Sequence, residues 1–137
     1  EMLRSLVGSE MCIRDRLDME LHNLTDTDNL NVVAFEKETM DKLGLIPEIA
    51  PRYRATYFSH IIGGYAAGYY SYLWAEVLDT DAFEAFKEHG VFDKNTADSF
   101  RKNILEKGGT EDPMTLYRGF RGADPSLEPL LKNRGLK

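Results

Sequence analysis

Apolar residues recur at helical spacing along most of the chain. Leu17, Leu21 and Leu24 lie three or four residues apart, which predicts the end of a helix within LDMELHNL. A second apolar series over 32–43 stops at Gly44, a residue type that favours the left-handed turn after a helix. These two segments predict a pair of amphipathic helices in the first third of the chain.

Capping residues divide the rest of the chain into further short helices. The expected starts are Asn29–Asn31, Asp79–Asp81 before a helix with Phe83 and Phe86, Asn95-Thr96, Asp112-Pro113 and Asp124-Pro125. Aspartate followed by proline is typical of a first helical turn. The expected ends are Gly90, Gly108-Gly109, Gly122 and Gly135. Alternating strand patterns are absent, so the sequence predicts an all-α fold of five to seven short or medium helices.

One segment differs from the other predicted helices in its density of polar aromatic residues. Residues 60–72 hold one histidine, three glycines and four tyrosines. If a helix begins at Tyr65, four side chains spaced by 4, 3 and 4 residues share one face: Tyr65, Tyr69, Tyr72 and Glu76. The preceding pair, Gly63 and Gly64, would form a hinge whose backbone approaches a ligand closely.

The histidine and tyrosines of this segment are candidate hydrogen-bond donors for catalysis. Donors aimed at a developing oxyanion typically change kcat by a factor of about one hundred or more each. A structural interpretation stays open, because tyrosine stripes at helical spacing commonly pack half-buried with a partner for each hydroxyl. On that interpretation His60 is a hydrogen-bonded structural residue and Gly63-Gly64 a simple turn.

Composition and charge narrow the class of protein and of partner. A chain of 137 residues, 42% hydrophobic and 29% charged, has the size and composition of one globular domain. Its net charge of −6 argues against nucleic acid or an anionic membrane as partner. No apolar run approaches the roughly eighteen residues of a membrane span. The single Cys12 excludes an internal disulfide framework and favours a cytoplasmic location, with a periplasmic one left open.

The first sixteen residues differ in composition from the residues that follow. Within them, SLVGSEMCIRDR resembles the translation of a sequencing-adapter read that occurs at the ends of unrelated metagenomic proteins. We therefore expect residues 1–16 to be a non-native lead and residues 17–137 to carry the fold. The alternative is an amphipathic helix that leads into the first predicted helix.

Three stretches resemble the carboxy-terminal end of the M3 family of zinc metallopeptidases. They are LDMELH (17–22), PRYRATYFSHIIGGYAAGYYSYLWAEVLDTDAFEAF (51–86) and GGTEDPMTLYRGFRG (108–122), within one register that covers about residues 17–137. The most specific string is His-x-x-Gly-Gly-Tyr-x-x-x-Tyr-Tyr-x-Tyr-x-Trp. Within the family the similarity points to the bacterial peptidyl-dipeptidase (dipeptidyl carboxypeptidase) branch, with oligopeptidase A and thimet oligopeptidase as relatives.

The resemblance implies a mostly helical, two-lobed peptidase, of which this chain is the carboxy-terminal part of the catalytic domain. In that family a His-Glu-x-x-His helix and a downstream glutamate bind zinc. None of His22, His60 and His89 begins such a motif, so the zinc ligands are expected upstream and none within this chain. A self-contained site built from these three histidines is the alternative.

The resemblance also assigns roles within the aromatic segment. His60 and Tyr72 would bind and stabilise the tetrahedral oxyanion, as catalytic residues. Tyr65 and Tyr69 would contact the backbone or the carboxy-terminal end of the substrate. The mobile loop beside the substrate would include Gly63 and Gly64.

The sequence therefore predicts part of a zinc metallopeptidase that hydrolyses oligopeptides and releases dipeptides from their carboxy-terminal ends. Its partners would be oligopeptide substrates and the upstream lobe of the same polypeptide, without which the chain is expected to be inactive. Two alternatives stay open: a non-catalytic helical module that binds peptides or a partner protein, and a purely structural α-domain. Arg52 and Arg54 are expected to be solvated or in structural ion pairs rather than on a substrate carboxylate, and Glu76 is expected to pair with a cation or to cap packing.

Overall fold

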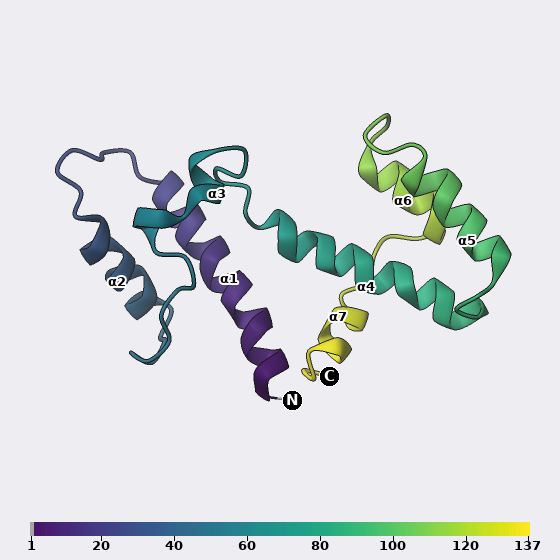
Figure 1. The fold of residues 1–137 in the computed structure, drawn as a ribbon, viewed down its shortest axis with the longest axis horizontal. Helices are drawn as coiled ribbons and strands as arrows, with labels where there is room; N and C mark the ends of the chain where they lie inside the picture. Colours follow the sequence, from purple (N-terminus) through teal and green to yellow (C-terminus); the bar gives the residue numbers. More distant parts are fainter. Residues whose placement is uncertain (1) are drawn as a thin grey trace. The chain divides into compact units, whose positions relative to one another are not determined.

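The computed structural model describes residues 2–137, with side chains from residue 10 onward, and every regular element in that range is a helix. In order they are α1 (Met2–His22), α2 (Val32–Lys42), η1 (Ala55–Tyr57), α3 (Ser59–Ile62), α4 (Ser71–His89), α5 (Lys94–Phe100), η2 (Arg101–Leu105), α6 (Pro113–Arg121) and α7 (Glu128–Asn133) (Figure 1). The predicted all-α class is confirmed. Two compact units divide the chain, the first ending at Leu73 and the second beginning at Trp74.

Local capping chemistry explains several helix boundaries that the sequence predicts. The Asn31 side chain accepts a hydrogen bond of 3.0 Å from the Ala34 N–H and caps α2. Asp112 does the same for α6 through the Thr115 N–H, also at 3.0 Å. Gly122 ends α6 with a left-handed φ of 78°. These predicted starts and this predicted end are confirmed.

The predicted helix start at Asp79–Asp81 is wrong, because these residues lie inside α4. The Thr80 hydroxyl donates to the carbonyl groups of Glu76 at 2.7 Å and Val77 at 3.1 Å, within the same helix. A hydroxyl committed to the preceding turn in this way does not cap a new helix. The predicted end at Gly90 is confirmed, and its φ is 113°.

Two other predicted starts are displaced by a few residues. α5 begins at Lys94 because the Asp93 side chain, rather than Asn95, caps it by accepting the Thr96 N–H at 2.7 Å. The last helix begins at Glu128 and not after Asp124. The Asp124 carboxylate accepts a hydrogen bond of 2.5 Å from the Arg118 side chain. A capping residue that finds another partner no longer marks a helix start.

The first unit is built around a core that joins α1, α2 and α3 to the segment before α4. Its buried side chains are Ile13, Leu17, Met40, Phe58, Ile61 and Tyr69. Leu17 and Phe58 have no exposed surface. Figure 1 shows α3 beside the carboxy-terminal end of α1, where this core forms. The expectation that residues 1–16 are a non-native lead stays a prediction.

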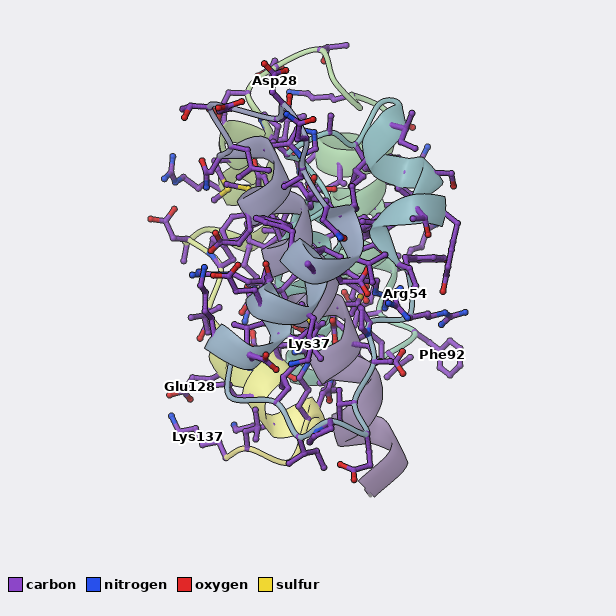
Figure 2. All side chains as sticks on the ribbon, turned by 90° about the vertical axis from the view of Figure 1, so that its left-hand side faces the viewer. Asp28, Lys37, Arg54, Phe92, Glu128 and Lys137 are labelled. Atoms are coloured by element: carbon purple, nitrogen blue, oxygen red, sulfur yellow. The ribbon has the colours of Figure 1, made fainter. Side chains whose placement is uncertain are left out.

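Phenylalanine rings organise the second unit. The ring centroid of Phe100 lies 5.9 Å from that of Phe86 on α4 and 5.1 Å from that of Phe120 on α6. Edge-to-face pairs at such distances add to the stability gained by burial. In contrast, the side chain of Phe92 is 99% exposed and points away from the ribbon (Figure 2).

Candidate active site

The aromatic segment folds as a series of turns, so the helix predicted from Tyr65 is wrong. Residues 63–70 are turns and α4 begins only at Ser71. The N–H groups of Ala67 and Tyr69 donate to the Asp18 carboxylate, at 3.0 and 2.9 Å, instead of to helix carbonyls. Ala67 takes a left-handed φ of 52°, which is incompatible with a right-handed helix.

The predicted aromatic candidates nevertheless lie together. The ring centroid of His60 is 5.9 Å from that of Tyr65, 5.3 Å from that of Tyr69 and 6.2 Å from that of Tyr72. The Tyr72 ring also stacks on Tyr65 at 5.3 Å and lies 4.8 Å from Tyr69. We call these four residues the tyrosine cluster. Turns therefore achieve the grouping that the sequence analysis ascribed to one helix face.

The four members of the tyrosine cluster differ in their access to solvent. Tyr69 is 4% exposed, whereas Tyr65 is 41% and Tyr72 37% exposed. A hydrogen bond with the Tyr65 side chain raises the pKa of Tyr72 above its ordinary value. The Tyr72 hydroxyl therefore bonds to the Tyr65 side chain on the solvent-accessible side of the cluster. This open arrangement differs from the fully buried one that a purely structural role would favour.

Aromatic rings surround the imidazole of His60. Its Nδ1 atom is buried and has no hydrogen-bond partner among the described residues. In contrast, the Nδ1 atoms of His22 and His89 lie 2.9 Å from carbonyl oxygens one helical turn earlier. An unpaired buried polar atom costs about 1–3 kcal/mol, and such atoms are often retained for function. His60 therefore stands apart from the two structural histidines.

The glycine pair before Tyr65 lies at the exposed edge of the cluster. The N–H groups of Gly63 and Tyr65 both donate to the His60 carbonyl, at 3.3 and 3.2 Å. A Cβ atom added to Gly63 or Gly64 would meet no atom within 4 Å. The positive φ of this segment lies at Ala67 and not at either glycine. The two glycines therefore leave open space beside the cluster, where a ligand can approach the backbone.

The charged residues near the segment are held by protein partners. Arg54 forms an ion pair with the buried Glu36, whose carboxylate also accepts the Ala55 N–H at 2.9 Å. Glu76 pairs with Arg134 at 2.6 Å. The predicted ion pairs of Arg54 and Glu76 are thus confirmed. The guanidinium group of Arg52 lies over the neighbouring Tyr53 ring, 5.9 Å from its centroid.

The side chains that the structure describes do not fit the metal that the resemblance implies. Among residues whose side chains are described, no three histidine, cysteine or carboxylate side chains gather as a metal site. We therefore assign no chemical step to a metal held by these residues. Within the same described range, no helix is both long and apolar enough to cross a bilayer.

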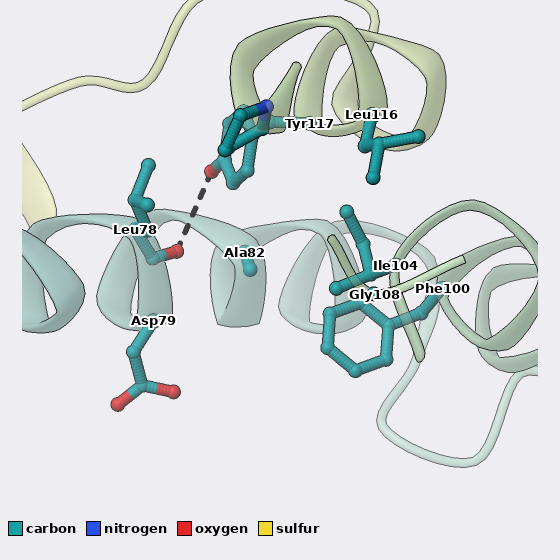
Figure 3. Close-up of a pocket in the computed structure, with 9 residues that line it drawn as sticks. Leu78, Asp79, Ala82, Phe100, Ile104, Gly108, Leu116 and Tyr117 are labelled. Carbon is teal, nitrogen blue, oxygen red and sulfur yellow. Dashed lines mark hydrogen bonds between the residues drawn. The ribbon is translucent and has the colours of Figure 1, made fainter. Parts of the chain in front are cut away.

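A cavity of about 350 Å³ in the second unit is separate from the predicted site residues. Its lining is mostly apolar and includes Leu78, Phe100, Ile104, Leu116 and Tyr117 (Figure 3). The Tyr117 hydroxyl lies 3.5 Å from the Leu78 carbonyl oxygen, the contact drawn in Figure 3, and donates its hydrogen bond to Asp81 at 2.5 Å. Asp79 also lines it, but its carboxylate points away from the other labelled residues in Figure 3, so this cavity has the character of a packing site.

Asp18 belongs to the structural surroundings of the cluster but was not among the predicted site residues. It lies between Leu17 and Leu21 in the LDMELH stretch. An aspartate next to two inward-facing leucines is the one local sign that its carboxylate turns inward. Its partners, Ala67 and Tyr69, are 49 and 51 residues away, which spacing within a helix does not reveal.

The sequence profile described as peptidase family M3 matches residues 4–136. The chain belongs to peptidase family M3. The family assignment made from the aromatic segment and its flanking stretches is thereby confirmed, and with it membership of a metallopeptidase family. The tyrosine cluster is therefore part of an M3 peptidase sequence.

Three relatives show how much of an M3 peptidase the chain represents. It is 57% identical over 81 residues to oligopeptidase A of Escherichia coli, covering 58% of this chain and 12% of that protein. Oligopeptidase A of Haemophilus influenzae is 43% identical over 121 residues, or 87% of this chain and 18% of the relative. Dipeptidyl carboxypeptidase of E. coli is 42% identical over 135 residues, which cover 93% of this chain and 19% of that protein. The chain thus spans less than a fifth of the length of each of these relatives.

Proposed function

We propose that this chain is the carboxy-terminal portion of an M3 zinc metallopeptidase and that the tyrosine cluster lines its active site. The observation that carries the proposal is the contact between two rings: His60, whose buried Nδ1 atom has no partner among the described residues, and Tyr72, which is 37% exposed. Family membership supports the choice of peptide hydrolysis over a binding role alone. The substrates would be oligopeptides, from which the enzyme releases carboxy-terminal dipeptides.

Within this site, His60 and Tyr72 would donate hydrogen bonds to the oxyanion that forms when water attacks the scissile carbonyl. Donors held in place by packed rings lose little freedom at that moment, which makes them effective. Tyr65, also exposed and stacked on Tyr72, would contact the substrate backbone. Direct contact of Tyr69 with substrate stays a prediction. Only 4% of its surface is exposed, so such contact would need the neighbouring side chains to move.

Zinc and its ligands would come from an upstream segment of the same polypeptide. The relatives are far longer than this chain, and the described residues hold no metal-ligand cluster. We therefore expect no peptidase activity from the purified 137-residue chain, even with added zinc. Chelator-sensitive hydrolysis of oligopeptides by this chain alone would contradict the upstream location of the metal.

The decisive experiment replaces one hydroxyl in the full-length enzyme. Tyr72→Phe should lower kcat at least ~10-fold with little change in KM, because it removes a donor used only in the transition state. Tyr70→Phe is the matched control, since Tyr70 is 55% exposed and lies two residues away, outside the tyrosine cluster. An unchanged kcat for Tyr72→Phe would remove Tyr72 from the proposed role.

A further inference from the structure

Asp18 is a carboxylate with no exposed surface, on the last turns of α1. Its Oδ1 accepts the Ala67 N–H at 3.0 Å, and its Oδ2 accepts the Tyr69 N–H at 2.9 Å. A buried carboxylate is costly unless its oxygens are bonded. The two oxygens of Asp18 are thus used to hold two backbone amides of the segment that carries the tyrosine cluster.

A second polar contact completes the surroundings of this carboxylate. The Nδ1 atom of His22, one turn further along α1, lies 2.9 Å from Oδ1 of Asp18. Hydrogen bonds to an ionised acceptor are stronger than those between neutral groups. Two of the three polar contacts of the Asp18 carboxylate thus go to residues 63–70, which contain three glycines and no regular helix.

The anchored amides fix the part of the segment that most needs support. Ala67 holds a left-handed φ of 52°, which an alanine rarely adopts on its own. Two residues later, the buried Tyr69 ring lies 5.3 Å from the His60 ring and 4.8 Å from the Tyr72 ring. The position of the Tyr69 backbone therefore determines how these two candidate donors are spaced.

We propose that Asp18 is a positioning residue of the active site. By holding the amides of Ala67 and Tyr69, it places the Tyr69 ring against both His60 and Tyr72 and fixes where their donors point. Asp18 itself touches no substrate. The inference rests on the proposed function of the tyrosine cluster and adds a residue from a separate part of the sequence to that site.

The test compares two buried carboxylates in the full-length, zinc-loaded enzyme. Asp18→Asn keeps the shape but offers one acceptor for two amides, so kcat should fall at least ~10-fold while KM changes less than ~3-fold. Asp81→Asn is the matched control, because Asp81 is 4% exposed and its partners Tyr117 and Arg121 belong to the second unit. Its kcat should stay within ~2-fold of the wild type. A folded Asp18→Asn enzyme with wild-type kcat overturns the inference.

A rescue experiment separates positioning from a general loss of stability. Glycine adopts positive φ without strain. Ala67→Gly therefore lets the segment hold this conformation with less help from Asp18. In the Asp18→Asn background it should restore kcat at least ~3-fold, while Ala67→Gly alone stays within ~2-fold of the wild type. Loss of kcat without any rescue would assign Asp18 a purely structural role and overturn the inference.

Failure of the proposed function can be distinguished from failure of the positioning role of Asp18. Wild-type kcat in Tyr72→Phe would refute the proposed function, whereas loss in Tyr72→Phe with none in Asp18→Asn would refute only the positioning role. Hydrogen exchange in the wild-type enzyme provides a measurement that does not depend on any variant folding. The amides of Ala67 and Tyr69 should exchange at least ~100-fold more slowly than in an unstructured peptide. Exchange at the unstructured rate would overturn the inference.

Discussion

The hydroxyl of Tyr117 on α6 donates a hydrogen bond of 2.5 Å to the buried carboxylate of Asp81 on α4. Arg121 stands near the same carboxylate, with its Nε atom 3.5 Å from Oδ2 of Asp81. Burial, together with the negative charge of Asp81, raises the pKa of Tyr117 well above its ordinary value near 10. Ionisation of Tyr117 would place a phenolate against a carboxylate, so the folded state retains this proton.

This relationship predicts a loss of stability at alkaline pH. Because the pKa of Tyr117 is raised in the folded state, its contribution to the free energy of unfolding is fully present below pH ~10. That contribution is lost as the pH rises further, and the slope of the free energy of unfolding against pH approaches the value for one proton per molecule. Tyr117→Phe should cost about 2 kcal/mol at pH 8 and remove that one-proton slope. Urea unfolding between pH 8 and 11.5 measures both. Equal slopes for the variant and the wild type would exclude Tyr117 as the group responsible, and Tyr57→Phe, at an exposed tyrosine, is the control.

The contact between Tyr65 and Tyr72 predicts a shift in titration. The hydrogen bond with Tyr65 is the main cause of the raised pKa of Tyr72. Tyr65→Phe should therefore lower the pKa of Tyr72 towards its ordinary value. Nuclear magnetic resonance of tyrosines labelled at Cζ follows each phenol through the titration. If the pKa of Tyr72 does not change in this variant, another group must hold its proton.

The left-handed conformation of Ala67 predicts opposite effects for a small and a branched replacement. Ala67→Gly should leave the free energy of unfolding unchanged or raise it by up to about 1 kcal/mol, since glycine accepts positive φ. Ala67→Val should lower it by about 2 kcal/mol, because β-branched residues fit this region poorly. Chemical denaturation of both variants gives the difference. Ala66→Val, one residue earlier and outside the left-handed region, should cost less than about 0.5 kcal/mol.

The core of the first unit predicts a large penalty at one leucine. Leu17 has no exposed surface and packs with Phe58 and Ile61. Leu17→Ala should lower the free energy of unfolding by about 3 kcal/mol, from lost burial and the cavity left behind. Met19→Ala, two residues further along α1 and 39% exposed in the native chain, should cost less than about 1 kcal/mol. Similar penalties for the two variants would contradict the placement of this core.

Features set by neighbouring residues could be predicted from the sequence, whereas features set by distant ones could not. The cap at Asn31 and the ends at Gly90 and Gly122 depend on chemistry within a few residues and were anticipated correctly. The start of α4 was placed too early, because Asp18 competes for the amides of the segment from about fifty residues away.

The candidate site follows the same division. Residue types and spacing sufficed to single out the histidine, the glycines and the tyrosines, and the rings do meet. Two features arise from tertiary packing: the support of the rings by Asp18, and the burial of the His60 Nδ1 atom without a partner among the described residues. Periodicity along one segment carries no information about such contacts.

Hydrogen bonds between Asp18 and main-chain amides do not depend on the identity of the side chains beside those amides. Asp18 would hold the same two N–H groups if the exposed residues Ala66 and Tyr70, which lie outside the tyrosine cluster, were exchanged for others. The backbone conformation of residues 67–69 should therefore not depend on which side chains occupy these two positions. Variants randomised at Ala66 and Tyr70 should therefore change the exposed surface beside the tyrosine cluster and leave His60, Tyr69 and Tyr72 in place.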